Sequence, residues 1–211
     1  MPKETVLRQQ VYEQIKHEII TCVLAPGSLL SEGQFVDRFK VSKTPIREAL
    51  TSLVQDGLVE YEPNRGFRVT PISVKDIQEI FDARAFFETA FFKLAVKYAS
   101  DVEIDQLETL SVKGEVVDGI SDVEYFMESN LKFHLALAAA ARNTRLLWYY
   151  SNLMNQAQRL FYLDISYHKA DLKWGYGHNE IIKALRDRDE AEGVAAIQAT
   201  LEQAKKRTLG I

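Results

Sequence analysis

Cysteine, proline and long apolar runs are all scarce in this chain of 211 residues. The single cysteine, Cys22, has no partner for an intrachain disulfide, which fits a reducing cytoplasm and excludes cysteine-rich zinc sites. The longest apolar run spans residues 135–141, whereas a helix needs about 20 apolar residues to cross a bilayer. The first residues also lack the basic end and apolar core of a secretory signal. We therefore expect a cytoplasmic protein that has no membrane partner.

An excess of positive charge is also missing, since the net charge is −4. Residues 1–75 carry 10 Lys and Arg against 9 Asp and Glu, and the remainder carries 16 against 21. Within residues 31–70 the two signs balance at 6 each. A general polyanion binder is therefore excluded, and any contact with nucleic acid has to depend on where the few cations lie.

Residues 1–72 show the order helix, helix-turn-helix, hairpin. Apolar residues at every fourth position from Leu7 to Ile19 predict a first helix that ends before a Pro-Gly turn. Ser31 stands at capping-box spacing from Gln34 and predicts the start of a second helix. A third helix is expected to begin at Ser42 and to stop at Gly57. Residues 58–62 and 67–70 read as two strands around a basic turn, which completes a winged helix-turn-helix.

Residues 73–211 read as helices joined by short links, which favours an antiparallel bundle. The expected helices span 73–99, 101–119, 121–141, 143–168, 171–187 and 189–208. The predicted fold class is thus mainly α, with an N-terminal winged helix-turn-helix that carries a small β-hairpin wing and a C-terminal antiparallel six-helix bundle.

The third helix has a polar side that could face a DNA duplex. Lys43, Thr44 and Arg47 fall opposite its apolar residues, and the start of a second helix in such a motif meets base edges in the major groove. Arg47 is suited to a bidentate guanine contact. The other candidates are Arg38 and Lys43 for phosphates, Ser42 at the helix start, and Asn64, Arg65 and Gly66 at the wing tip. From charge alone, these residues could equally be solvated surface groups.

Several stretches of this region resemble the DNA-binding domain of the GntR family of bacterial transcription regulators. They are Pro26-Gly27, Leu30-Ser31-Glu32, Val41-Ser42-Lys43-Thr44-Pro45-Ile46-Arg47-Glu48-Ala49-Leu50, Leu53, Asp56-Gly57-Leu58-Val59 and Arg65-Gly66-Phe67-Arg68-Val69. The resemblance covers nearly all of residues 8–71 and implies binding to double-stranded operator DNA. Two departures stand out: Gly33 where many members have an arginine, which the resemblance implies to be a DNA contact, and Cys22 where many have a glycine.

The expected bundle carries polar residues on apolar helix faces. Arg84 and Glu88 belong to one such row, and Asn130 and His134 share a face of another helix. His178 lies among apolar residues further along the chain. The Arg-Glu pair could lie at the edge of the bundle, and the histidines could be ordinary core residues. Alternatively, Arg84 could face an acidic ligand and the histidines could bind a metal or an anion.

The second part of the chain is similar to the all-helical effector domain of the FadR-type subfamily. The similarity rests on Asp82-Ala83-Arg84 with Glu88, Asn130 to His134, Asn143, His178 with Ile182 and Ala184, and Asp189 with Ala191. Many such domains bind a divalent metal through one aspartate and three histidines. His134 and His178 match this set, but Asn130 and Thr200 replace the other two ligands. Arg84 matches an arginine that faces a carboxylate effector in similar domains.

These replacements leave two alternatives for the pocket. A weaker zinc or nickel site could use His134, His178, Asn130 and water. Otherwise, the histidines with Arg84 hold an organic acid directly, with no metal. We favour the second alternative, because a doubly substituted ligand set loses most of its affinity for metal.

We expect a homodimeric regulator, usually a repressor in this family, that binds a pseudo-palindromic operator and responds to a small carboxylate metabolite. The effector residues would be Arg84, Glu88, Asn130, His134 and His178. A bundle that only dimerises is a second hypothesis. A helical metallohydrolase using His134 and His178, with Glu88 as the base, is a weaker third, because no paired-carboxylate or nucleophile signature accompanies it.

Overall fold

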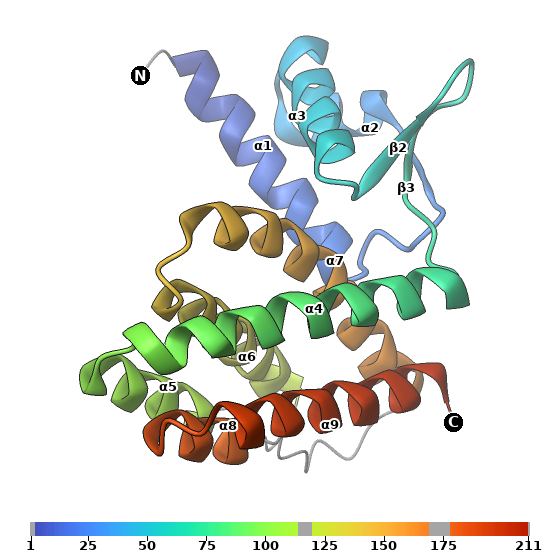
Figure 1. Ribbon diagram of the computed structural model, residues 1–211. Coiled ribbons are helices and arrows are strands. Elements are labelled where there is room, and N and C mark those ends of the chain that lie inside the picture. Colours follow the sequence, from blue (N-terminus) through green and yellow to red (C-terminus); the bar gives the residue numbers. More distant parts are fainter. Residues whose placement is uncertain (1–2, 114–119, 169–177, 211) are drawn as a thin grey trace. The chain divides into compact units, whose positions relative to one another are not determined.

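The computed structural model describes residues 3–113, 120–168 and 178–210. The chain divides into two compact units, 1–73 and 74–211. Figure 1 shows the expected helices and hairpin in the first unit and the expected helical bundle in the second.

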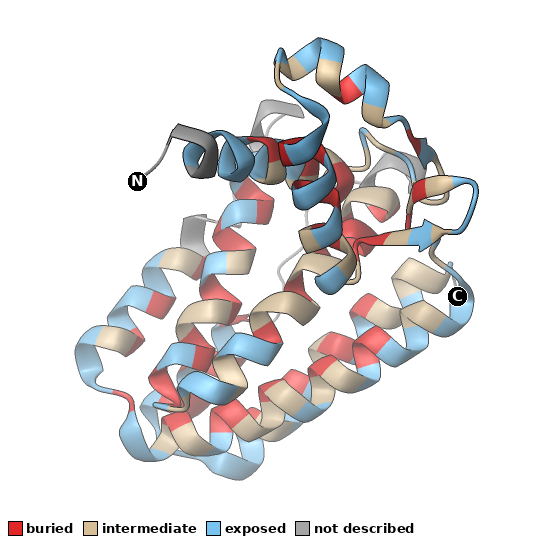
Figure 2. Cartoon of the chain, turned by 90° about the horizontal axis from the view of Figure 1, so that it is seen from above, coloured by how far each residue is buried: buried red, intermediate tan, exposed pale blue. Residues whose placement is uncertain are grey.

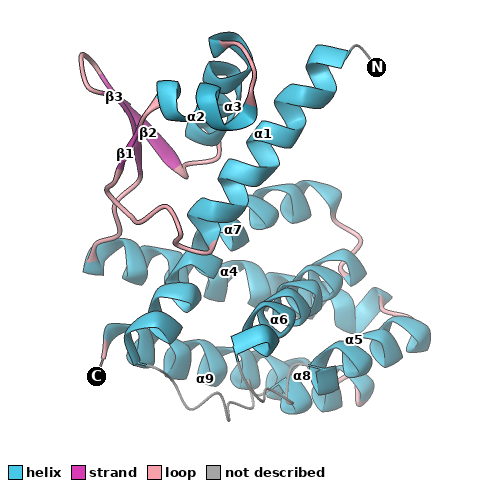
Figure 3. Ribbon diagram, turned by 180° about the vertical axis from the view of Figure 1, so that it is seen from behind, coloured by secondary structure: helices cyan, strands magenta, loops and turns pink. Residues whose placement is uncertain are grey.

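The first unit contains three helices and a small sheet. Its elements are α1 (Lys3–Ile20), β1 (Leu29–Leu30), α2 (Glu32–Phe39), α3 (Lys43–Gln55), β2 (Val59–Glu62) and β3 (Gly66–Val69). The sheet is antiparallel with the order β1-β3-β2 and lies beside α2 and α3 (Figure 3). The predicted wing was a two-stranded hairpin, and the structure adds β1 as a third strand on β3.

Local backbone chemistry sets the ends of these elements. The Ser31 hydroxyl accepts a hydrogen bond from the Gln34 amide at 3.4 Å, which caps α2 as its spacing predicts. Gly57 follows α3 with a φ of 72°. Cys22 follows α1 with a φ of 60°, in the left-handed region that costs most residues about 1–2 kcal/mol. A glycine, which has no Cβ, would adopt this conformation without that cost.

One apolar core holds the first unit together. It joins the inner sides of α1 and α3 to Phe35 of α2 and to the sheet. Its fully buried members include Ile15, Ile46, Leu50 and Leu53. Burial of each such side chain contributes about 1.5–3 kcal/mol. The apolar face of α3 is therefore fixed inward, and its polar face is fixed outward.

The second unit is all helical within the described ranges. Its helices are α4 (Val74–Tyr98), α5 (Asp101–Lys113), α6 (Ile120–Ala140), α7 (Thr144–His168), α8 (His178–Arg186) and α9 (Glu190–Leu209). The parts of the expected helices that fall on 114–119 and 171–177 lie outside the described residues. Buried and exposed residues alternate along these helices, as expected where each is covered on one side (Figure 2). No described helix is long and apolar enough to cross a bilayer.

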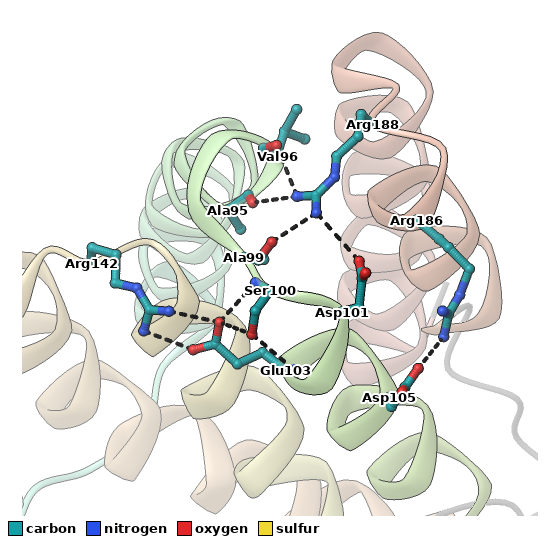
Figure 4. Close-up of polar contacts among 10 residues, drawn as sticks. All are labelled: Ala95, Val96, Ala99, Ser100, Asp101, Glu103, Asp105, Arg142, Arg186 and Arg188. Atoms are coloured by element: carbon teal, nitrogen blue, oxygen red, sulfur yellow. Dashed lines mark hydrogen bonds and ion pairs between the residues drawn. The ribbon is translucent and has the colours of Figure 1, made fainter.

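Arginines at two interhelical turns tie the ends of the bundle helices together (Figure 4). Arg188 donates to the carbonyls of Val96 and Ala99 at 3.0 and 2.8 Å, at the C-terminal end of α4. Arg142 pairs with Glu103 at 2.7 Å, and Glu103 also accepts from the Ser100 amide at the start of α5. These contacts satisfy backbone groups that have no partner within their own helix.

Candidate nucleic-acid interface and buried polar site

The first turn of α3 presents cations to solvent. The side chains of Lys43 and Arg47 are 67% and 60% exposed, and Thr44 is exposed beside them. Ile46 and Leu50 on the opposite side are fully buried. The structure thus places these side chains where the sequence pattern predicts, on an accessible surface.

Glu32 holds the two cations close to each other. Its carboxylate lies 2.8 Å from Nζ of Lys43 and 3.3 Å from Nε of Arg47, and its side chain is only 16% exposed. Glu32 belongs to the first turn of α2, so this ion pair also joins the two helices of the motif. Ser42 caps α3 with an extended backbone, and its hydroxyl makes no capping hydrogen bond.

The other predicted DNA-contacting cations are also paired with carboxylates. Arg38 forms two hydrogen bonds to Glu18 of α1, one of them at 2.8 Å. Arg65 lies 3.5 Å from Glu62 at the wing tip, where Asn64 and Gly66 turn the chain with φ values of 66° and 90°. Each of these cations therefore has a carboxylate partner and remains on the surface.

A polar cluster lies in the interior of the bundle. Nε of Arg84 donates to Glu88 at 2.8 Å, and the Tyr150 hydroxyl donates to the same carboxylate at 2.7 Å. His134 lies 3.3 Å from the other Glu88 oxygen through Nδ1 and 3.3 Å from Nη2 of Arg84 through Nε2. Arg84, Glu88 and His134 are at most 4% exposed. The pair is therefore buried in the core and does not lie at the edge of the bundle.

The charges of this cluster compensate each other. Burial alone would raise the pKa of Glu88, but Arg84, followed by His134 and Tyr150, outweighs burial and lowers it below the ordinary value. Burial opposes the charge of Arg84 as well, and the Glu88 carboxylate more than offsets it and raises the pKa of Arg84. Burial and Glu88 raise the pKa of Tyr150 well above its ordinary value. Glu88 is thus an ionised carboxylate held by a permanent cation.

His178 and Asn130 lie in the same interior. The His178 ring stacks on Phe133 with 3.8 Å between centroids and lies 5.3 Å from the His134 ring. Burial, with His134 as a second cause, lowers the pKa of His178 well below its ordinary value. The side-chain oxygen of Asn130 is buried and accepts no hydrogen bond from the described residues. An acceptor left in this state costs about 1–3 kcal/mol, so it marks a place where a donor group would be favoured.

The residues of this interior do not fit a divalent metal. Among the described residues, no three His, Cys, Asp or Glu side chains are grouped so that they could share an ion. Nε2 of His134 faces the guanidinium of Arg84 at 3.3 Å, which is always a cation and has no lone pair to donate. A metal on this nitrogen would therefore meet a permanent positive charge. Asn130 and Thr200 supply no anionic ligand in compensation.

Sequence reasoning missed Glu32 and Tyr150 as parts of these sites. Glu32 lies at the start of a helix, where acidic residues are common because they interact favourably with the helix dipole. Its position therefore gave no sign of a role in the site. Tyr150 reaches Glu88 across 62 positions in the chain, and no local pattern signals such a contact.

Comparisons with known proteins agree with both units. Residues 7–69 match the model of the bacterial regulatory proteins of the gntR family, and residues 79–203 match the FCD domain. The HTH-type transcriptional repressor RspR of Escherichia coli is 29% identical over 184 residues, which cover 87% of this chain and 80% of that protein. The gluconate operon transcriptional repressor of Bacillus licheniformis is 26% identical over 83% of this chain and 74% of its own length.

Solved structures show the same fold. Escherichia coli McbR/YncC superposes with a TM-score of 0.82 at 22% identity and covers 97% of both chains. A GntR regulator from Rhodococcus gives 0.80 at 24% identity, over 96% of this chain and 97% of its own.

Proposed function

Because this chain belongs to the GntR family of DNA-binding transcription regulators and carries an FCD domain, we propose that it is a cytoplasmic, homodimeric repressor. It binds a pseudo-palindromic operator, and a small carboxylate metabolite in the bundle modulates this binding. The observation that carries the proposal is the exposed cationic face at the start of α3, with Lys43 and Arg47 accessible and the opposite side fully buried. Repression is inferred from relatives that are named repressors.

In this proposal Arg47 reads a guanine, and Lys43 with the wing tip positions the duplex through phosphates. Glu32 keeps Arg47 extended before DNA arrives, which lowers the entropy that the side chain loses on binding. The Glu32 side chain is largely buried beside Lys43 and Arg47. DNA phosphates therefore have to compete with its carboxylate for these two cations.

Operator selection from random duplexes tests the DNA-reading role. The Arg47→Ala variant should lose about 1–3 kcal/mol of discrimination at one base pair of each half-site. The Lys43→Ala variant should weaken binding to all sequences by a similar factor, because a phosphate contact carries no base information. Unchanged base preference in Arg47→Ala would remove Arg47 from this role.

The bundle interior supports an organic acid as the effector. Arg84 is the only cation that the described cluster offers to a carboxylate, and Glu88 already occupies it. An incoming acid therefore replaces Glu88 on the guanidinium or shares it. The buried side-chain oxygen of Asn130 is an acceptor, so it can bind a hydroxyl group of the metabolite but not its carboxylate. Such an exchange would move α4, α6 or α7, because Arg84, Glu88, His134 and Tyr150 come from these three helices.

The bundle also has a surface suited to pairing with a second copy of the chain. Phe86 of α4 is 71% exposed, and Trp148 and Tyr149 of α7 are 63% and 59% exposed. We call these three residues the aromatic patch. Phe86 and Tyr149 are the chain neighbours of Phe87 and Tyr150, whose ring centroids lie 6.0 Å apart. At about 200 Å² for each aromatic side chain, the patch offers about 400 Å² of apolar surface, or half of what one partner buries in a stable dimer.

The buried polar cluster of the bundle does not favour an enzymatic function. A metallohydrolase that uses Glu88 needs a carboxylate able to take a proton from water. The lowered pKa of Glu88 makes it a weak base, and Arg84 and Tyr150 already donate to one of its oxygens. We therefore assign Glu88 to positioning Arg84.

A further inference from the structure

A polar groove of about 700 Å³ runs along the outer side of α3 next to α1. The polar face of α3 lines this groove from the first turn to the end of the helix. The lining residues are Arg8, Lys43, Thr44, Arg47, Glu48, Thr51, Ser52 and Gln55. Every one of them is polar or charged, so the groove is suited to a hydrated, charged ligand.

Among the cations of this groove, Arg8 is the one for which the described residues provide no carboxylate partner. It is exposed on α1, and among the described residues no acidic group lies within ion-pair distance of it, whereas Lys43 and Arg47 share Glu32. The Thr51 hydroxyl already donates to the carbonyl of Arg47 at 2.7 Å. The donors left for an anion in this half of the groove are thus the guanidinium of Arg8 and the side-chain amide of Gln55.

The length of α3 indicates which anion comes near these donors. At 1.5 Å per residue, Gln55 lies about 16 Å along the helix from Thr44, while the major groove is about 12 Å wide. If the first turn of α3 lies between the two sugar-phosphate backbones of the major groove, the second half of the helix therefore lies next to one of these backbones. Glu48 repels phosphate from the middle of the groove, and Arg8 attracts it at the side of α1.

We propose that Arg8, together with Gln55, binds a backbone phosphate of the duplex at the edge of the major groove that α3 enters. This inference rests on DNA binding by the winged unit and adds α1 to its contact surface. The contact is independent of base sequence, because it is made to phosphate only.

Binding to a mixed-sequence duplex of about 30 base pairs, measured between about 50 and 200 mM salt, tests the contact without knowledge of the operator. Each phosphate contact contributes about 0.9 to the slope of log K against log salt concentration. The slope of Arg8→Gln should be lower than that of the wild type by about this amount. Lys16→Gln is the matched control: it loses the same charge on the same helix, two turns away and outside the groove, and its slope should stay unchanged.

A second variant keeps the test independent of any damage to α1. Gln55→Lys adds a cation beside Arg8, and it should raise affinity and steepen the slope by about 0.9. An unchanged slope in either groove variant, or an equal loss in Lys16→Gln, would overturn the proposed contact. If the wild-type chain itself did not bind duplex DNA, the regulator function would fail instead, so the two failures are distinguishable.

Discussion

Gly33 shows how one residue can limit DNA affinity without affecting the fold. It lies in the first turn of α2 next to Glu32, and a Cβ built on it would meet only the Ser31 hydroxyl, at 3.8 Å. The resemblance to the GntR family implies an arginine at this position in many members. The site therefore has room for a long side chain on the same surface as Lys43 and Arg47.

The Gly33→Arg variant should bind operator DNA more tightly. A new charge-assisted hydrogen bond contributes about 1 kcal/mol or more, which corresponds to at least a fivefold lower Kd. Fluorescence anisotropy with a labelled duplex measures the change. Gly33→Ala is the control for helix stabilisation, and its Kd should equal that of the wild type. Equal affinity of Gly33→Arg and Gly33→Ala would show that no DNA group comes near this position.

Glu88 is the residue on which the buried cluster depends. Glu88→Gln would leave Arg84 as an uncompensated charge in the core, and breaking such a pair costs about 3–5 kcal/mol. Replacing both charges, in Arg84→Met with Glu88→Leu, removes that penalty, so the double variant should be more stable than Glu88→Gln. Urea unfolding measures both. If Glu88→Gln unfolded at the same urea concentration as the wild type, the interior would contain enough water to screen Arg84.

At the scale of helices, close packing of α4 on α9 depends on Gly193. A Cβ built there would lie 1.9 Å from the ring of Phe92, which is fully buried. Gly193→Ala should therefore destabilise the bundle by about 1–3 kcal/mol through overpacking. Gly33→Ala is the matched control, because the same change in an open helical position should stabilise by about 0.5–1 kcal/mol. Thermal unfolding followed by circular dichroism distinguishes the two, and a stabilised Gly193→Ala would mean that the helices can separate at low cost.

The elements that the sequence predicted are those whose signals are local. The cap at Ser31, the turn at Gly57 and the fourfold spacing of apolar residues each depend on neighbours within one or two turns. β1 was missed because a strand of two residues has no periodicity and forms only when β3 pairs with it. The Arg84-Glu88 pair was visible as an i,i+4 spacing, but its burial and its contacts with His134 and Tyr150 required the packing of three helices.

At the scale of the whole molecule, two DNA-binding units have to be paired if a palindromic operator is to be read. We expect the double variant Phe86→Ser with Trp148→Ser to dissociate into monomers at concentrations where the wild type is a dimer, because it removes most of the aromatic patch. Sedimentation velocity measures this. Tyr98→Ser is the control, since Tyr98 is 54% exposed on α4 but lies three turns from Phe86. A double variant that sediments like the wild type would place the pairing surface elsewhere.

The proposed regulator requires that acid binding in the bundle and operator binding by the DNA-binding units affect each other. Thermodynamic linkage predicts the relation between the two affinities. If a carboxylate metabolite changes operator affinity by a factor of about 5–150, equivalent to 1–3 kcal/mol, operator DNA has to change the affinity for that metabolite by the same factor. Calorimetric titration of a panel of small organic acids into the free protein and into its operator complex measures the change in acid affinity. Titration of the operator with and without the acid measures the change in operator affinity. Arg84→Met with Glu88→Leu should abolish acid binding, so adding the acid should no longer change the operator affinity of this variant. An acid that binds the free and the DNA-bound protein equally well would be a ligand of the bundle without being an effector, since equal affinity for two states shifts neither.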